Sequence, residues 1–329
     1  MGGGRGECSI TDLRILVLTA DFPPAHWSGI GIAVFHQTNA LRERGVEVEV
    51  LTRERLEGVH FPLEVRRGDI VHLHSLALAE LALELTRRFE LPLVYTAHSL
   101  IERELGERAA SWAALQQRVF EAADAVIFVS RAEREAAPNV QRAHVVHNGV
   151  KRRADFSPPS DGLKPALRFC PAGPIVFAGR FTRNKGLDIV LDLAESIPRE
   201  FVLAGGHGDP DLERRAASRS MGWLPHDELH ALFARAALVL MPSRYEPFGM
   251  VALEAMRAGA PLLASEALRE VAMPESIVRG DWRDAVTQLL AQPETLRELH
   301  ERGPRHVAEH FDASVLAEKL LAILESVAR

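Results

Sequence analysis

Short apolar segments alternate with helical patterns along most of this chain of 329 residues. A strand that is apolar along its whole length must be buried on both faces, so the alternation predicts parallel sheets with helices on each side. Strands are expected at 13–19, 46–51, 69–74, 93–97, 125–129, 143–146, 174–178, 201–204, 236–240 and 261–264. Helices are expected at 32–44, 76–89, 107–123, 186–196, 226–234, 281–291, 293–309 and 313–328.

A proline-rich, polar segment at 153–173 interrupts this alternation, which starts again at Pro174. The interruption predicts two tandem Rossmann-like, doubly wound α/β domains at 13–152 and 174–311, joined by a linker and facing a cleft. Residues 1–12 are expected to be disordered. Ligands of such domains bind outside the carboxyl ends of the parallel strands, where we expect the functional residues to lie.

The composition excludes several classes of function. A net charge of −6 leaves no broad basic surface to displace counterions, which argues against a nucleic-acid-binding protein. The only cysteines are Cys8 and Cys170, too few for a disulfide framework, so we expect a reducing, cytoplasmic location. No apolar stretch approaches the length of a transmembrane segment, and we expect a soluble protein.

The stretch at 241–259 carries the strongest functional signal. Its loop holds Glu246, and a helix is expected to begin at Phe248 or Gly249 and to end at Gly259. Glu254 lies on this helix among small apolar residues, where a buried carboxylate is costly unless donors meet it. The free N–H groups of the helix N-terminus suit an anion or hydroxyl oxygens. The stretch therefore predicts a polyol or sugar-phosphate site.

A second signal follows the strand at 174–178. Arg180 and Lys185 lie in the turn before a helix, and two cations beside a helix N-terminus form a diphosphate site without a metal. The alternative is a solvated basic loop. Lysine is rare here, with four in the chain, which favours a functional Lys185.

In the first domain, Gly29 and Gly31 lie in the turn after the first strand and would let backbone N–H groups approach phosphate or sugar oxygens. His98 follows the strand at 93–97, at an edge where ligands bind, and is a candidate for function. His72 and His147 are interpreted instead as histidines bonded by the backbone.

Asp209 and Asp211 resemble a D-x-D metal site, but acidic residues are also ordinary at a helix N-terminus. We prefer the second interpretation and expect no metal or other cofactor. The sequence shows no zinc spacing of Cys and His, no nucleophile elbow and no Walker loop.

Together these residues resemble glycosyltransferase family 4, the retaining, nucleotide-sugar-dependent enzymes of the two-domain B-type glycosyltransferase fold. The resemblance covers most of the chain. Its motifs are Ser28-Gly-Ile-Gly31, His98, Asn148-Gly149, Gly179-Arg180 with Lys185-Gly186, Gly222-x-Leu224, and Pro242-Ser243 through Glu246-x7-Glu254. Two departures are Ser28, where the family usually has glycine, and 266–270, where it has a glycine-rich turn.

The resemblance implies a role for each motif. Arg180 and Lys185 would hold the donor diphosphate and stabilise it as it leaves, Glu254 would bind the ribose hydroxyls, and Glu246 the donor sugar. His98 would lie near the reacting carbon, so the catalytic set is His98, Glu246, Arg180 and Lys185. Further donor-binding groups would be Gly29, Gly31, Gly222, Leu224, Phe248, Gly249 and Met250. Residues 312–329 would form a helix that crosses back to the first domain.

The implied activity is transfer of a hexosyl group from a UDP-, GDP- or ADP-linked sugar to a hydroxyl acceptor, with retention and without a metal. The acceptor class stays open among small molecules, glycans and lipids, as do the nucleobase and the sugar. One alternative is a nucleotide-sugar epimerase of the same fold. Another is a non-catalytic sugar-nucleotide-binding subunit. Whether Glu246 is a nucleophile or only a sugar-binding group is left open.

Overall fold

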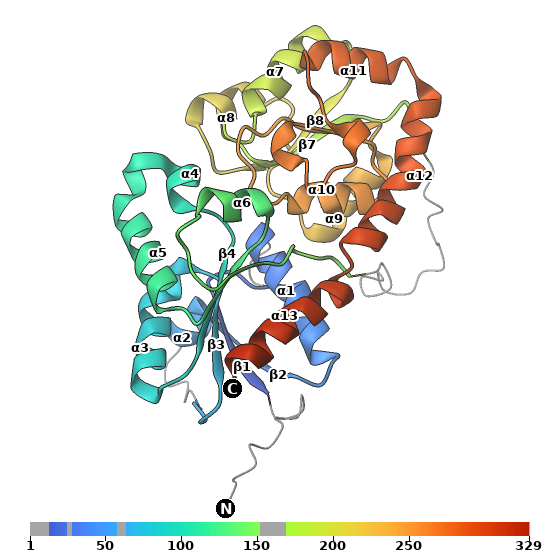
Figure 1. The fold of residues 1–329 in the computed structure, drawn as a ribbon. Coiled ribbons are helices and arrows are strands. Elements are labelled where there is room, and N and C mark those ends of the chain that lie inside the picture. Colours follow the sequence, from blue (N-terminus) through green and yellow to red (C-terminus); the bar gives the residue numbers. More distant parts are fainter. Residues whose placement is uncertain (1–12, 25–27, 58–63, 152–168, 329) are drawn as a thin grey trace, which may run out of the picture. The chain divides into compact units, whose positions relative to one another are not determined.

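The computed structural model describes residues 13–24, 28–57, 64–151 and 169–328, with the side chains of 107 and 108 left out (Figure 1). The chain divides into two compact units, Met1–Gly149 with Ala313–Arg329, and Val150–Asp312. The expected disorder at 1–12 and most of the expected linker at 153–173 lie outside the described residues.

The first unit is built on a parallel sheet with the strand order β2-β1-β3-β4-β5-β6. Its strands are β1 (Arg14–Thr19), β2 (Glu47–Thr52), β3 (Ile70–Leu73), β4 (Leu93–Ala97), β5 (Ala125–Phe128) and β6 (Ala143–Val145). The buried side chains of β1 alternate between two cores. Ile15 and Val17 pack in the core that includes residues of α1 (Gly29–Arg42) and α13 (Ala313–Val327). Leu16 and Leu18 pack in the core that includes residues of α3 (Ala79–Phe89).

The helices of this unit are α1 (Gly29–Arg42), α2 (Arg53–Glu57), α3 (Ala79–Phe89), α4 (Ile101–Leu105), α5 (Ala110–Ala122), α6 (Arg131–Ala136) and α13 (Ala313–Val327). Three-residue and four-residue 3₁₀ turns lie at Leu76–Leu78 and Gly106–Ala109. The short helices α2, α4 and α6 were not predicted, because five or six residues show too little periodicity. The predicted start of α1 at Ile32 was wrong by one turn.

The second unit holds a parallel sheet with the order β10-β9-β7-β8. Its strands are β7 (Ile175–Arg180), β8 (Phe201–Gly206), β9 (Leu238–Met241) and β10 (Leu262–Ala264). Its helices are α7 (Leu187–Ser196), α8 (Pro210–Ala216), α9 (His226–Arg235), α10 (Met250–Arg257), α11 (Trp282–Leu290) and α12 (Pro293–His310). The prediction of two parallel-sheet α/β domains is confirmed.

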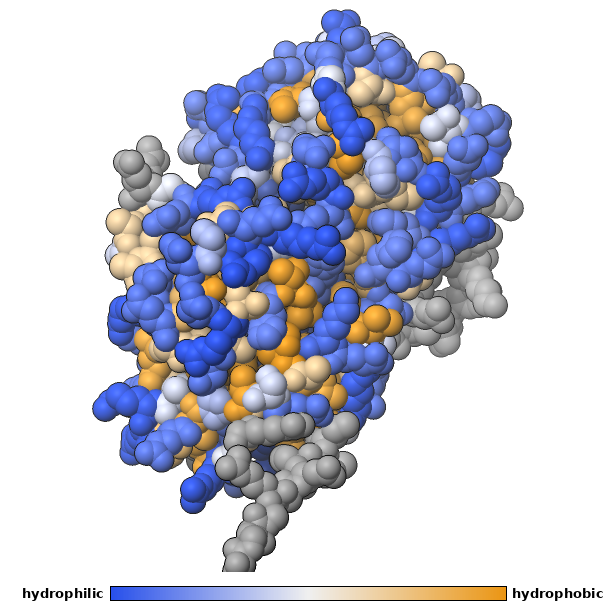
Figure 2. Space-filling view, in the orientation of Figure 1, coloured by the Kyte–Doolittle hydropathy of each residue, from blue (hydrophilic) through white to orange (hydrophobic). Residues whose placement is uncertain are grey.

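The face drawn in Figure 2 is mainly hydrophilic, with groups of hydrophobic residues between hydrophilic ones. In the part of the chain that the structure describes, every helix is too short or too polar to cross a membrane.

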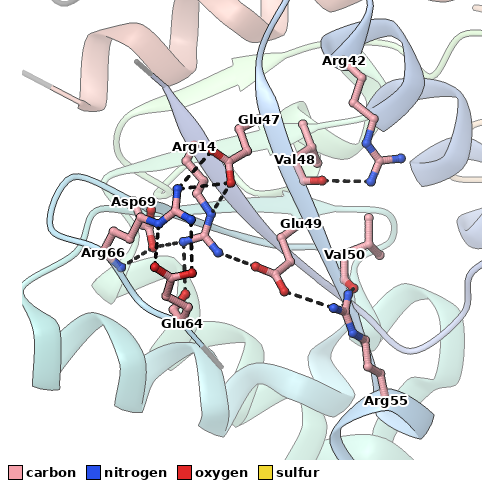
Figure 3. Close-up of polar contacts among 10 residues, drawn as sticks. All are labelled: Arg14, Arg42, Glu47, Val48, Glu49, Val50, Arg55, Glu64, Arg66 and Asp69. Carbon is pink, nitrogen blue, oxygen red and sulfur yellow. Dashed lines mark hydrogen bonds and ion pairs between the residues drawn. The ribbon is translucent and has the colours of Figure 1, made fainter. Parts of the chain in front are cut away.

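The buried guanidinium of Arg14 forms ion pairs at the amino ends of three neighbouring strands of the first unit. Arg14, the first residue of β1, is 6% exposed and its guanidinium meets the carboxylates of Asp69, Glu47 and Glu49 (Figure 3). Its Nη1 atom donates to Asp69 Oδ2 at 2.8 Å, and Asp69 is 1% exposed. A buried guanidinium needs such partners, because a charge without them would be strongly destabilised.

Two further arginines bind the backbone of β2, which is one of the two edge strands of this sheet. Arg42 Nη2 donates to the carbonyl of Val48 at 2.9 Å, and Arg55 Nη1 donates to that of Val50 at 2.8 Å (Figure 3). An uncovered edge strand invites pairing with another chain, and charged side chains bonded to its carbonyls prevent that.

Replacing Arg14 tests the weight of the buried cluster. We expect Arg14→Ala to destabilise the protein by about 3–5 kcal/mol, because Asp69 is left as a buried charge without its guanidinium. Arg118→Ala is the matched control, since Arg118 pairs with Glu80 on the surface and such pairs contribute about 0–1 kcal/mol. Urea unfolding of both variants measures the difference, and equal losses would contradict the assignment.

Candidate active site

The candidate site of the second unit is built where the loops after β7 and β9 meet. Gly186 has a φ of 74°, and a Cβ atom there would lie 2.2 Å from the carbonyl oxygen of Pro242. The carbonyl of Asn184 accepts the backbone N–H of Arg244 at 2.8 Å. Since only glycine permits this approach, Gly186 holds the two loops against each other.

A side-chain pair locks the same two loops from the solvent side. Arg244 binds both oxygens of Asp188 at 2.8 Å and also donates to the carbonyl of Arg183. Burial works against ionisation of Asp188, yet the hydrogen bonds and charge of Arg244 hold the pKa of this carboxyl below its ordinary value. The loop after β7 is therefore fixed by backbone and side chain together.

This packing brings Lys185 and Glu246 into contact, although 61 positions separate them in the sequence. Lys185 Nζ lies 2.8 Å from Glu246 Oε2, and Ser243 Oγ donates to the same oxygen at 3.3 Å. Both side chains are largely buried, with 19% and 10% of their surface exposed. Two residues that the sequence pointed to separately thus form one ion pair.

The helix α10 begins beside this pair. Gly249 is the N-cap of α10 and has a φ of 107°. A Cβ atom at this position would lie 2.5 Å from Leu268 Cδ2. Phe248 and Met250 are buried, and Phe248 packs edge-on against Phe311. A Cβ atom at Gly249 would also lie 3.6 Å from Glu246 Cγ, so the start of α10 lies against the Glu246 side chain.

Glu254 is 2% exposed on α10 and has a protein partner that the sequence reasoning missed. His226 Nε2 lies 3.3 Å from Glu254 Oε1, and His230 lies one turn along α9 with its ring 4.4 Å from that of His226. Arg257 Nη2 lies 3.2 Å from His230 Nε2. The burial of Glu254 therefore does not by itself require a ligand. The i, i+4 spacing of the two histidines was the available signal.

The ligand atoms of His226, His230 and Glu254 lie within 4.8 Å of one another, close enough to surround a metal ion. The guanidinium of Arg257 would have to leave His230 before a second cation could bind there, because like charges repel. Asp209 and Asp211, the other pair considered as metal ligands, each have a partner within the protein. Asp209 accepts the N–H of Arg183, and Asp211 pairs with Arg214.

The remaining predicted groups of the second unit lie at the end of the β7–β8 pair. Arg180 is half-buried as the last residue of β7 and pairs in register with Gly206 of β8. The carbonyl of Gly222 accepts the N–H of Gly205 at 2.8 Å, which places the 222–224 segment beside the carboxyl end of β8. Leu224 is half-buried there.

In the first unit, Gly29 and Gly31 form the first turn of α1 rather than a loop before it. Ser28 is the N-cap, and its Oγ accepts the N–H of Gly31 at 3.0 Å. The N–H of Gly31 is therefore occupied within the protein, while Gly29 stands at the start of the helix. The serine that departs from the family pattern is a capping residue.

His98 is half-buried after β4, and its Nε2 lies 3.0 Å from Nδ1 of His74. The ring of His74 lies 4.1 Å from that of His72, tilted by 43°. His72 Nε2 is hydrogen-bonded to Thr96 Oγ1 at 2.8 Å. Burial lowers the pKa of His98 to about 4 and that of His72 to about 3. All three rings, which we call the histidine ladder (His72, His74, His98), are therefore neutral at neutral pH.

The chain matches two family profiles, one in each half. The profile described as Glycosyltransferase Family 4 matches residues 59–153, and that described as Glycosyl transferases group 1 matches residues 173–324. Both profiles describe glycosyltransferases, so the chain is an enzyme of that class, a glycosyltransferase, and its residues 59–153 match family 4.

Relatives and solved structures agree with this assignment. The chain is 26% identical to alpha-maltose-1-phosphate synthase of Mycolicibacterium smegmatis over 96% of its own length and 100% of the relative. It is 28% identical to D-inositol 3-phosphate glycosyltransferase 1 of Catenulispora acidiphila, over 91% and 90% of the two chains. Sucrose-phosphate synthase of Thermosynechococcus elongatus has the same fold, with a TM-score of 0.74 at 22% identity over 94% and 97% of the chains. The fold is therefore the B-type glycosyltransferase fold.

Proposed function

We propose that this enzyme transfers a hexosyl group from a nucleotide-diphosphate sugar to a hydroxyl acceptor, with retention of anomeric configuration and without a metal ion. The observation that carries the proposal is the contact of Lys185 with Glu246 beside the N-terminus of α10. It joins a cation for a diphosphate to a carboxylate and backbone donors for sugar hydroxyls. A solved structure of Anabaena HepE in complex with UDP and glucose supports the choice of donor, with a TM-score of 0.70.

The proposed chemistry follows from the charges that develop. Breaking the anomeric C–O bond leaves positive character on the sugar and negative charge on the diphosphate. Arg180 and Lys185 stabilise the departing diphosphate, and preorganised charges of this kind are effective because they need not reorient during the reaction. The leaving phosphate then takes the proton of the acceptor hydroxyl, which attacks from the same face.

The other residues hold the donor in place. Glu254 binds the ribose hydroxyls, Gly29 contributes an N–H to the phosphate or sugar, and the 222–224 segment borders the nucleobase. The names of the relatives are those of synthases and transferases, which supports transfer over epimerisation. The cytoplasmic location stays a prediction, and the acceptor stays open among small molecules, glycans and lipids.

A transfer assay in EDTA tests the proposal as a whole. We expect UDP-, GDP- or ADP-glucose to donate its sugar to an acceptor alcohol at an undiminished rate in excess chelator. Proton NMR of the product should show the anomeric configuration of the donor. Loss of activity that returns with a divalent cation would contradict metal independence and direct attention to His226 and His230. An inverted product would contradict retention.

Replacing Lys185 tests the diphosphate role. We expect Lys185→Ala to lower kcat by about 10²-fold or more, because a preorganised charge on the leaving group is lost. Lys319→Ala is the matched control, since Lys319 is exposed on α13. A near wild-type kcat for Lys185→Ala would contradict the assignment.

Replacing Glu254 tests the ribose role. Glu254→Gln keeps an oxygen that can accept from His226 but removes the charge that ribose hydroxyls would meet. We expect UDP, or the nucleotide of the preferred donor, to bind at least about tenfold more weakly by calorimetry, as expected for a lost charge-assisted hydrogen bond. Glu266→Gln, an exposed glutamate of the same unit, is the control. Unchanged affinity for Glu254→Gln would exclude the contact.

A further inference from the structure

The histidine ladder leaves two buried ring nitrogens without a partner in the described part of the chain, Nδ1 of His72 and Nε2 of His74. His74 is 3% exposed and touches His98 through its other nitrogen, at 3.0 Å. A buried imidazole with one satisfied and one unsatisfied nitrogen is uncommon, because polar groups in protein interiors are normally paired. The arrangement therefore constrains where the protons of these rings lie.

A neutral imidazole carries one proton, so the contact between His74 and His98 has two possible forms. In the first form His74 donates from Nδ1, its Nε2 is a bare lone pair, and the proton of His98 is on Nδ1. In the second form His98 donates from Nε2, and His74 carries a buried N–H with no acceptor. Both cannot donate, because only one proton fits between the two nitrogens.

The first form is favoured. Orphaned N–H groups in protein interiors are rarer than unpaired acceptors. If the His74 ring carried two protons, it would donate from both nitrogens, and the choice between the two forms would not arise. Burial and the neighbouring histidine rings, however, hold the pKa of His74 well below its ordinary value. Both rings are therefore neutral.

We propose that His74 is a positioning residue that keeps the proton of His98 on Nδ1. His98 then offers its site an N–H donor rather than a bare nitrogen. Resting on the proposed function, this makes His98 a hydrogen-bond donor to an oxygen of the donor sugar and excludes it as the base that takes the acceptor proton. The contact with His74 thus determines which nitrogen of His98 carries the proton.

The tautomer can be measured directly in the ligand-free enzyme. Nitrogen-15 NMR of histidine-labelled protein, with His98 assigned by its loss in His98→Gln, should show a protonated Nδ1 and an unprotonated Nε2. In His74→Leu we expect the proton of His98 to move to Nε2, the form that an unpartnered histidine favours. In His74→Asn the amide group can again donate to His98 Nε2, and the original tautomer should return.

Activity should follow the tautomer. We expect kcat/KM to fall about tenfold in His74→Leu, as for the loss of one hydrogen bond, and to recover in His74→Asn. His144→Leu is the matched control, since His144 is half-buried on β6 outside the ladder.

Two results would overturn the inference. One is a wild-type His98 with its proton on Nε2, a measurement that needs no folded variant. The other is an unchanged His98 tautomer in His74→Leu. A wild-type enzyme that transfers no sugar would instead refute the proposed function and leave the tautomer assignment standing.

Discussion

The candidate site of the second unit depends on the close contact of Gly186 with the carbonyl of Pro242. With any side chain at Gly186, the loop after β7 could not lie against the loop after β9. The two loops would then separate, and Lys185 would lose Glu246. The lock between Arg244 and Asp188 acts on the same pair of loops, but it only reinforces an approach that the glycine permits.

The sequence predicted the elements well because the apolar pattern decides them. β4 begins and ends at the expected residues, and α10 begins one residue after Gly249. Pairings between distant side chains could not be predicted, since no spacing rule links Lys185 to Glu246 or His226 to Glu254. The start of α1 was missed for a different reason. Ser28 was read as a departure from a glycine motif, whereas its hydroxyl caps the helix.

Buried polar groups are stabilised in more than one way in this protein. In the first unit, Arg14 keeps its charge at 6% exposure because carboxylates surround it, and the histidine ladder avoids charge altogether. In the second unit, Glu254 lies beside a histidine that can donate to it. A buried charge needs opposite charges around it, whereas a neutral ring needs only hydrogen-bond partners.

The contact of Lys185 with Glu246 also bears on the two roles proposed for Glu246. A carboxylate that meets an ammonium group at 2.8 Å and a serine hydroxyl at 3.3 Å through the same oxygen is a weakened nucleophile, because its negative charge is already stabilised. The same partners suit a group that only accepts hydrogen bonds from sugar hydroxyls through its other oxygen. The pair thus favours the binding role for Glu246. In the proposed mechanism the departing phosphate then acts as the base, and Lys185 would contact both the carboxylate and the diphosphate.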